Sequence, residues 1–157
     1  MNGELFQASW SPTGYLTKKH QQPLSEIPAS TKGDGNLNYV MIRYADVLLM
    51  HAEAALESGN ATEALDKLEM IRARARGANN TLLPKITSTD IVELRAKVHQ
   101  ERRIELAMEW ERFYDLVRWD EAKSVVPGFI VGKHELFPIP QTEIDKSAGV
   151  ITQNPGY

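Results

Sequence analysis

The sequence predicts an all-α protein made of a helical hairpin, one long helix, and long irregular segments at the N- and C-terminal ends. Three observations predict this class. Apolar residues recur at helical spacing over 39–77, a helical period returns over 89–123, and prolines and glycines gather outside these stretches. The chain of 157 residues has the length of one ordinary domain, so we treat 1–157 as a single domain.

Composition excludes several classes of protein. The net charge of −3 gives no general attraction to nucleic acid or to an anionic membrane, so we expect no nucleic-acid partner. The chain has no cysteine, which excludes disulfides, thiolate metal sites and a cysteine nucleophile. It has no long apolar run that predicts a transmembrane segment, and its first residues lack the pattern of a signal peptide. The loop-like start suggests that the chain begins inside something larger.

The first two segments are a loop leader and a hairpin. Residues 1–38 are rich in turn-forming residues and show no sustained period. Within 39–77, Gly59 is placed to end a first helix, and Asn60 with Glu63 forms a capping box that opens a second helix. A link this short predicts an antiparallel pair. Small residues occur at the spacing of a tetratricopeptide repeat unit, where they let two helices approach closely: Ala52, Gly59, Ala64 and, completing the pattern, Leu68.

The remaining segments are the long helix and an irregular end. Asp90 and Glu93 form a second capping box, and no glycine or proline interrupts the chain from there to Trp119. We therefore predict one long helix over 89–123. The last segment, 124–157, contains prolines that prevent regular helix and is predicted to be irregular.

The stretch "ERRIELAMEWERFYDLVRW" gathers acidic and basic side chains that could form a catalytic pair, a metal site or ion pairs. Arg102, Glu105, Glu109 and Arg112 follow one another by three, four and three residues, so each acid has an arginine within helical reach. An arginine partner keeps the pKa of a carboxyl group low, and a carboxyl group with a low pKa is a poor general acid. These four residues are thus predicted to form a structural ion-pair ladder, and a catalytic role for Glu105 or Glu109 is a remote alternative.

No other pattern points to catalysis, a metal or a cofactor. His20, His51, His99 and His134 do not show the spacing of metal ligands. The chain also lacks a glycine-rich phosphate loop and a G-x-S-x-G elbow. We expect no catalytic residue, no metal site and no cofactor.

Aromatic side chains are the weak candidates for a ligand site. Trp10, Tyr15, Tyr39 and Phe129 lie in or beside predicted loops, where a ring could stack on the apolar face of a sugar. Packing beneath the loops is the favoured interpretation of each.

Several motifs occur in an order that is specific in combination. They are "PTGYLTKKH", "IRYADVLLMHAEA", "ALDKLEMIRARA", "ERRIELAMEWERFYDLVRW", "LFPIPQTEI" and the terminal "QNPGY". Together they resemble the C-terminal part of the SusD/RagB family of nutrient-binding lipoproteins of Bacteroidetes. Trp110 departs from the family pattern, because a glycine is common at its position, and a tryptophan there needs space.

The resemblance implies a fold, a place and a function. It implies tetratricopeptide-like hairpins, attachment to the outward face of the outer membrane, partnership with a SusC-like TonB-dependent transporter, and non-enzymatic delivery of oligosaccharide. The family's lipidation cysteine is absent from this chain. Much of the family's ligand site lies upstream of the matching part, so the resemblance assigns no ligand-binding residue here.

Two functions therefore stand as hypotheses. The first is oligosaccharide binding without catalysis, and the alternative is a tetratricopeptide-like module that docks a partner chain without touching the ligand. A lone hairpin cannot bury both of its faces, so we also expect an exposed apolar face or self-association.

Overall fold

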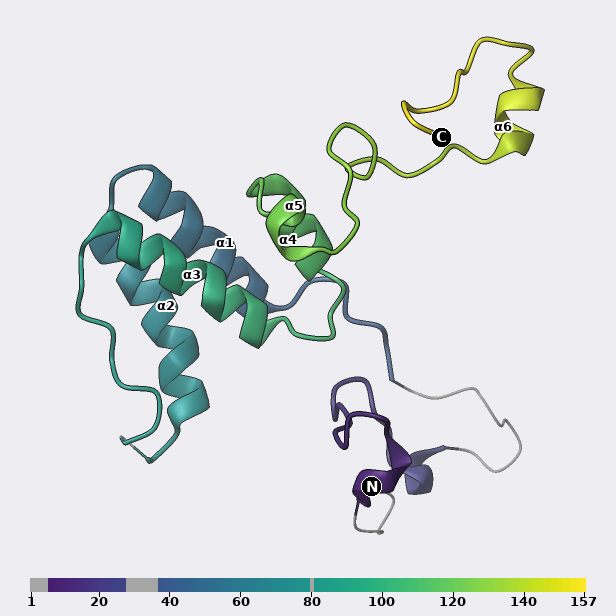
Figure 1. Cartoon of the computed structure of the whole chain (residues 1–157). Helices are drawn as coiled ribbons and strands as arrows, with labels where there is room; N and C mark the ends of the chain where they lie inside the picture. The colour runs from purple at the N-terminus through teal and green to yellow at the C-terminus, as the bar shows by residue number, and fades with distance from the viewer. Residues whose placement is uncertain (1–5, 28–36, 80) are drawn as a thin grey trace. The chain divides into compact units, whose positions relative to one another are not determined.

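The computed structural model describes residues 6–27, 37–79 and 81–157, and these are helical or irregular, with no strand among them (Figure 1). The all-α prediction is confirmed. No described helix is both long and apolar enough to cross a membrane. The helices are η1 (Ala8–Trp10), η2 (Leu24–Glu26), α1 (Tyr44–Glu57), α2 (Ala61–Arg76), α3 (Ile91–Glu105), α4 (Arg112–Arg118), α5 (Ala122–Val125) and α6 (Gln141–Lys146). The chain divides into two compact units, Met1–Met108 and Glu109–Tyr157, whereas the sequence analysis treats it as one domain.

The hairpin of the first unit forms as its capping residues predict. Gly59 takes the left-handed conformation, with φ of 82°, and closes the end of α1. The Asn60 side chain accepts a hydrogen bond from the Glu63 backbone N–H at 3.2 Å, and its amide donates to the Glu63 carboxylate at 2.9 Å. Asn60 therefore caps α2 as predicted, although Glu63 returns to its side-chain amide and not to its backbone N–H as in a full capping box. Helix α2 ends just before Gly77 as predicted, whereas α1 begins at Tyr44, five residues after the start of the predicted stretch.

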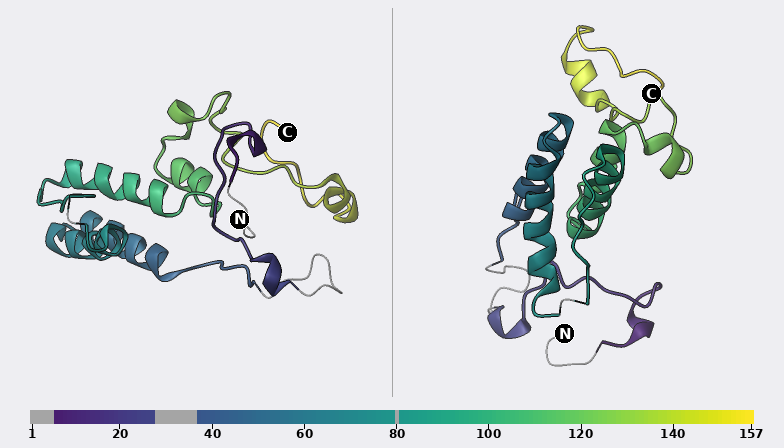
Figure 2. Two further views of the ribbon diagram at one scale, coloured as in Figure 1. Left: turned by 90° about the horizontal axis from the view of Figure 1, so that it is seen from below. Right: turned by 90° about the vertical axis from the view of Figure 1, so that its left-hand side faces the viewer.

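Helix α3 packs on α1 and α2 and completes the core of the first unit. In both views of Figure 2, α1 and α2 lie together and α3 runs alongside them as a second layer. Asp90 caps α3 by accepting from the Glu93 N–H at 2.8 Å, as predicted. The core draws on all three helices through fully buried residues, namely Leu49, Ala52, Leu56, Ala64, Leu68, Ile71, Leu94 and Val98.

The prediction of one long helix over 89–123 is wrong. Helix α3 ends at Glu105, and the next helix begins only at Arg112. Between them, Met108 and Trp110 have φ values of 66° and 71°, which a continuous helix cannot contain. No glycine or proline marks the break, so the sequence carries no ordinary stop signal at this place.

Trp110 occupies a backbone conformation that suits glycine. Its φ is 71° and its side chain is 73% exposed, so the indole gains little from burial while the backbone is strained. We expect Trp110→Gly to raise the free energy of unfolding by about 1 kcal/mol. Urea unfolding followed by circular dichroism measures it.

Tyr114→Gly is the matched control, because this exposed aromatic lies inside α4. Glycine within a helix is expected to cost about 1 kcal/mol, the opposite sign. A loss of stability in both variants would show that Trp110 is not strained.

The segment before the hairpin is held at the end of α3. Lys19 Nζ donates to the carbonyl oxygens of Glu105 at 2.7 Å and Ala107 at 2.8 Å. Because the last carbonyls of a helix lack partners within the helix, the ammonium group stabilises this end by both hydrogen bonding and the helix dipole.

In the second unit, the two C-terminal motifs bind each other. The Gln153 amide pairs with the Ile139 backbone, accepting from its N–H at 2.8 Å and donating to its carbonyl at 2.9 Å. Asn154 donates to the Phe137 carbonyl at 2.6 Å, and the Tyr157 hydroxyl donates to the Leu136 carbonyl at 3.0 Å. The end of "QNPGY" thus provides the partners that a proline-interrupted segment cannot find in a helix or sheet.

Candidate functional site

Two members of the predicted ladder, Arg102 and Glu105, pair with residues outside their own helix. Arg102 is almost fully buried, and its Nη1 donates to Asp46 Oδ1 of α1 at 2.9 Å. Glu105 Oε1 accepts from Arg43 Nη1 and from Arg74 Nη2 of α2, both at 2.6 Å. Arg102 and Glu105 both lie within α3, and each has an ion-pair partner on another part of the first unit.

The other two members of the ladder lie beyond the end of α3. Glu109 and Arg112 belong to the second unit, so helical spacing no longer relates them to Arg102 and Glu105. Glu105 therefore has tertiary partners, and the part of the ladder that joins Glu109 to Arg112 stays a prediction.

Glu105 has the electrostatics of a structural carboxylate. Burial raises the pKa of its carboxyl, but the hydrogen bonds from Arg43 and Arg74 outweigh burial and hold the pKa below the ordinary value of 4.5. A carboxyl held ionised in this way accepts hydrogen bonds and does not deliver a proton near neutral pH.

This pairing makes the first unit acid-sensitive. Because the pKa is lowered by folding, the stabilisation is fully present above about 4.5 and is lost as the pH falls through the folded value. Glu105→Gln is expected to cost about 1.5–3 kcal/mol at pH 7 and to flatten the loss of melting temperature below pH 4.5.

Glu143→Gln is the control, since Glu143 makes only an exposed pair with Lys146 in α6. This variant is expected to keep the stability at pH 7 and the acid response of the original chain. An acid response that is the same in the Glu105→Gln chain would contradict the assignment.

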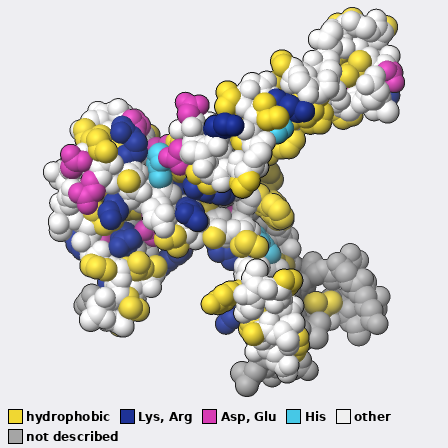
Figure 3. All heavy atoms as spheres, in the orientation of Figure 1, with side chains coloured by type: hydrophobic (Ala, Val, Ile, Leu, Met, Phe, Trp, Pro, Cys, Tyr) yellow, Lys and Arg dark blue, Asp and Glu magenta, His cyan; other side chains and the backbone are white. Residues whose placement is uncertain are grey.

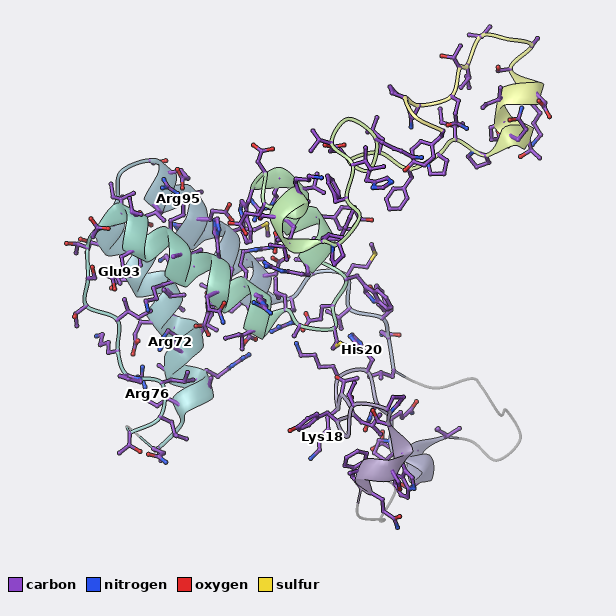
Figure 4. All side chains as sticks on the ribbon, in the orientation of Figure 1. Lys18, His20, Arg72, Arg76, Glu93 and Arg95 are labelled. Carbon is purple, nitrogen blue, oxygen red and sulfur yellow. The ribbon has the colours of Figure 1, made fainter. Side chains whose placement is uncertain are left out.

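The arginines of "RARAR" are also engaged within the first unit. Arg72 Nη1 pairs with Glu101 at 2.7 Å, and Arg76 pairs with Glu69 at 2.7 Å. Arg72 and Arg76 also donate to the Pro84 and Leu83 carbonyls, so the two labelled side chains hold the connection after α2 (Figure 4). On the face of the three-helix body drawn in Figure 3, acidic and basic side chains are interleaved.

The histidines and acids do not gather into a metal site within 6–27, 37–79 and 81–157, where no group of three or more such side chains could hold an ion. His51 Nε2 lies 2.7 Å from Glu63, next to the capping box. His134 Nδ1 accepts from the Ile130 N–H at 3.0 Å. Both side chains therefore have structural partners.

The four aromatic candidates fall into two environments. Tyr15 is 82% exposed and Tyr39 is 60% exposed, with the Tyr39 ring stacked on His20 at 5.9 Å between centroids. Trp10 is half exposed and meets Phe6 edge to face at 6.1 Å. Phe129 is buried in the small core of the second unit with Leu116 and Ala122. Sugar contact by any of these aromatics stays a prediction, and the exposed rings of the first unit fit it best.

Sequence reasoning missed concave features in both units. An apolar groove of about 310 Å³ lies between the start of α1 and the end of α2, lined by Tyr44, Leu48, Met70 and Ile71, with Arg43 and Arg74 at its rim. A cavity of about 230 Å³ lies in the second unit against Phe129. The polar residues around each come from separate turns and helices, so periodicity does not reveal them.

The fold and its surfaces define a class: an all-helical scaffold with a tetratricopeptide-like hairpin, structural ion pairs at its centre and exposed aromatics in its irregular segments. The family model described as "SusD family" matches residues 4–135. This chain belongs to the SusD family, as its motifs predict.

Individual relatives agree with this membership. SusD-like protein P2 of Formosa agariphila is 34% identical over 135 residues, which is 79% of this chain and 27% of the relative. SusD-like protein P38 of the same organism is 39% identical over 93 residues, covering 57% of this chain and 18% of the relative. The chain thus spans about a quarter or less of the length of these relatives.

Solved structures show the same fold. A crystal structure of a SusD-like protein from Bacteroides fragilis has a TM-score of 0.64 and 34% identity, covering 76% of this chain and 26% of the other. A SusD homologue from Bacteroides thetaiotaomicron has a TM-score of 0.64 and 32% identity, covering 78% of this chain and 28% of the other.

Proposed function

We propose that this chain takes part in the non-catalytic binding of oligosaccharide at the outward face of a bacterial outer membrane, for import through a SusC-like TonB-dependent transporter. Membership of the SusD family carries this proposal. The structural role of Glu105 and the arginine-paired acids agrees with a protein that binds without catalysis.

Exposed rings in the first unit are the proposed sugar contacts. Tyr15 and Tyr39 present aromatic area to solvent, and an aromatic ring offers an apolar face with a polar edge, which matches the two kinds of surface on a pyranose. Stacking of this kind tolerates many sugars, so the identity of the oligosaccharide depends on polar groups elsewhere.

Isothermal titration against a panel of neutral and acidic oligosaccharides tests the proposal. The titration is run on this chain and on a longer protein that contains it at its C-terminal end. Binding is expected for the longer protein, and Tyr15→Ala and Tyr39→Ala are expected to weaken any affinity that this chain shows.

Tyr114→Ala is the matched control, an exposed tyrosine of the second unit whose loss is expected to leave the affinity unchanged. A longer protein with no affinity for any oligosaccharide would overturn the proposal. Turnover of a glycosidic substrate that Glu105→Gln or Glu109→Gln abolishes would replace it with a hydrolase.

The alternative is a docking module, and the groove between α1 and α2 favours it. Tyr44 and Met70 line this groove and are 67% and 46% exposed, and Val47 extends the apolar surface along α1. Retention of the purified transporter by this chain, weakened by Met70→Glu and not by Val92→Glu, would support docking. Self-association through exposed apolar residues stays a prediction that sedimentation of the chain tests.

A further inference from the structure

The cavity of the second unit combines an apolar wall with a polar rim. Its lining has four apolar residues, here called the wall (Val117, Ala122, Phe129 and Val131), and three exposed charged residues, here called the rim (Asp120, Lys123 and Glu135). A small concave site that is mostly apolar, with a few placed polar groups, is the usual form of a small-molecule site.

Asp120 has a left-handed backbone conformation that glycine adopts more readily than aspartate. It follows the end of α4 with φ of 57°, its N–H donates to the Val117 carbonyl at 3.1 Å, and the Glu121 N–H donates to the Leu116 carbonyl at 2.8 Å. These two hydrogen bonds are those of a Schellman motif, whose left-handed position is most often glycine.

The same chain shows the motif in its ordinary form. At the end of α1, Gly59 has φ of 82°, and the hydrogen bonds run from Gly59 to Leu56 and from Asn60 to Ala55. An aspartate in place of this glycine adds backbone strain, which is reason to ask what its side chain does.

The carboxylate of Asp120 is available to a ligand. In the part of the chain that the structure describes, it makes no hydrogen bond or ion pair. The other two rim groups are anchored but have capacity left. Lys123 Nζ donates to the Phe129 carbonyl at 3.2 Å, and Glu135 Oε1 accepts from the Gly132 N–H at 3.0 Å. A carboxylate oxygen and ammonium hydrogens therefore remain on groups that each already have one protein partner.

One residue of the apolar wall, Phe129, is firmly packed. Phe129 is 4% exposed and is packed by Phe113, at 6.3 Å between ring centroids, and by His134, which meets it edge to face at 5.7 Å. A ring that is already packed in the free protein removes one entropic cost of association.

The charges of the rim favour a neutral ligand with hydroxyl groups. Two carboxylates repel an anion, and Lys123 offsets part of their attraction for a cation. Hydroxyl groups satisfy all three rim groups, because a hydroxyl donates to carboxylates and accepts from an ammonium group. If the hydroxyl groups belong to a sugar ring, the C–H face of that ring can lie on the apolar wall.

We propose that this cavity is a subsite for one neutral pyranose ring, with Asp120 and Glu135 accepting from ring hydroxyls and Lys123 donating to one. The inference rests on the proposed function and extends it to a site within the second unit. Asp120 and Glu135 are binding residues here and have no catalytic role.

Two-dimensional amide NMR of the 157-residue chain tests the subsite. The probes are methyl β-D-glucopyranoside and methyl β-D-galactopyranoside, with glucuronate and glucosamine as the charged comparisons. We expect millimolar binding of a neutral probe, with shifts in the amides of 117–135 and weaker binding of the charged sugars.

Asp120→Gly separates ligand binding from backbone strain. It is expected to raise the melting temperature, because glycine relieves the strain, and to weaken binding about tenfold, because the carboxylate is lost. Asp120→Asn keeps the size and turn preference of the side chain and is expected to weaken binding severalfold.

Ala148→Gly is the matched control. Ala148 follows α6 with φ of 51° and donates to the Asp145 carbonyl, so it is a left-handed non-glycine residue at the end of another helix. It is expected to raise the melting temperature and leave the affinity unchanged.

The possible results separate this subsite from the proposed function. Shifts confined to the region of Tyr15 and Tyr39 would support oligosaccharide binding and overturn the subsite. Unchanged affinity in both Asp120 variants, or a preference for a charged sugar, would also overturn it. If a longer protein binds oligosaccharide but the 117–135 amides of this chain do not respond to any probe, the proposed function is supported and the subsite is overturned.

Discussion

Arg102→Met is expected to lower the free energy of unfolding by about 3–5 kcal/mol. Arg102 is 4% exposed, and its partner Asp46 is 9% exposed, so the substitution leaves a carboxylate in the interior without its cation. Removing one member of a buried pair costs more than the pair itself contributes, because the remaining charge keeps its desolvation cost. Urea unfolding of the chain, followed by helical circular dichroism, measures the change.

The neighbouring arginine provides the control. Arg103 lies next in α3 but is exposed, so Arg103→Met is expected to change stability by about 0.5 kcal/mol or less. The double variant Asp46→Leu with Arg102→Met removes both charges and is expected to recover most of the loss. Equal effects of Arg102→Met and Arg103→Met would show that the Arg102–Asp46 pair is not buried.

Leu94→Ala is expected to cost about 2–5 kcal/mol. Leu94 is fully buried in the core formed by α1, α2 and α3, so the substitution loses apolar burial and leaves a cavity. The result measures how strongly α3 is bound to the hairpin, because Leu94 and Val98 are the fully buried apolar residues that α3 contributes.

Val92→Ala is the companion variant on the same helix. Val92 is 72% exposed, and its truncation is expected to change stability by about 0.5 kcal/mol or less. A similar cost for both variants would contradict the packing of α3 on the hairpin.

The hairpin could be predicted from the sequence because its signals are local. Gly59, Asn60 and Glu63 fix the turn through backbone conformation and hydrogen bonds between close neighbours in the chain. The capping box at Asp90 and Glu93 works in the same way. The all-α class and the family followed from the period and from the order of the motifs.

The break after Glu105 could not be predicted by the same means. The chain there has no glycine or proline, and Lys19 and Arg43, which bind the last carbonyls of α3, come from distant parts of the sequence. The position of Trp110 was a sign of the break, since glycine is common at this place in the family. Its φ of 71° explains that preference, because glycine adopts a positive φ without strain.

The ion pairs illustrate the same limit at the site. Helical spacing offers Arg102 as the partner of Glu105, but Arg43 and Arg74 bind it. The rim of the cavity in the second unit was missed for a related reason. Asp120, Lys123 and Glu135 come together through two turns and a short helix, and no periodic pattern records that arrangement.

The contacts of Lys19 have a consequence for the order of folding. They join residues 86 and 88 positions apart in the chain, whereas the turn between α1 and α2 closes over a few residues. Closing a long loop costs more chain entropy than closing a short one, so the hairpin forms early and the Lys19 contacts form late. Loss of the Lys19 side chain would then accelerate unfolding and leave the rate of folding nearly unchanged.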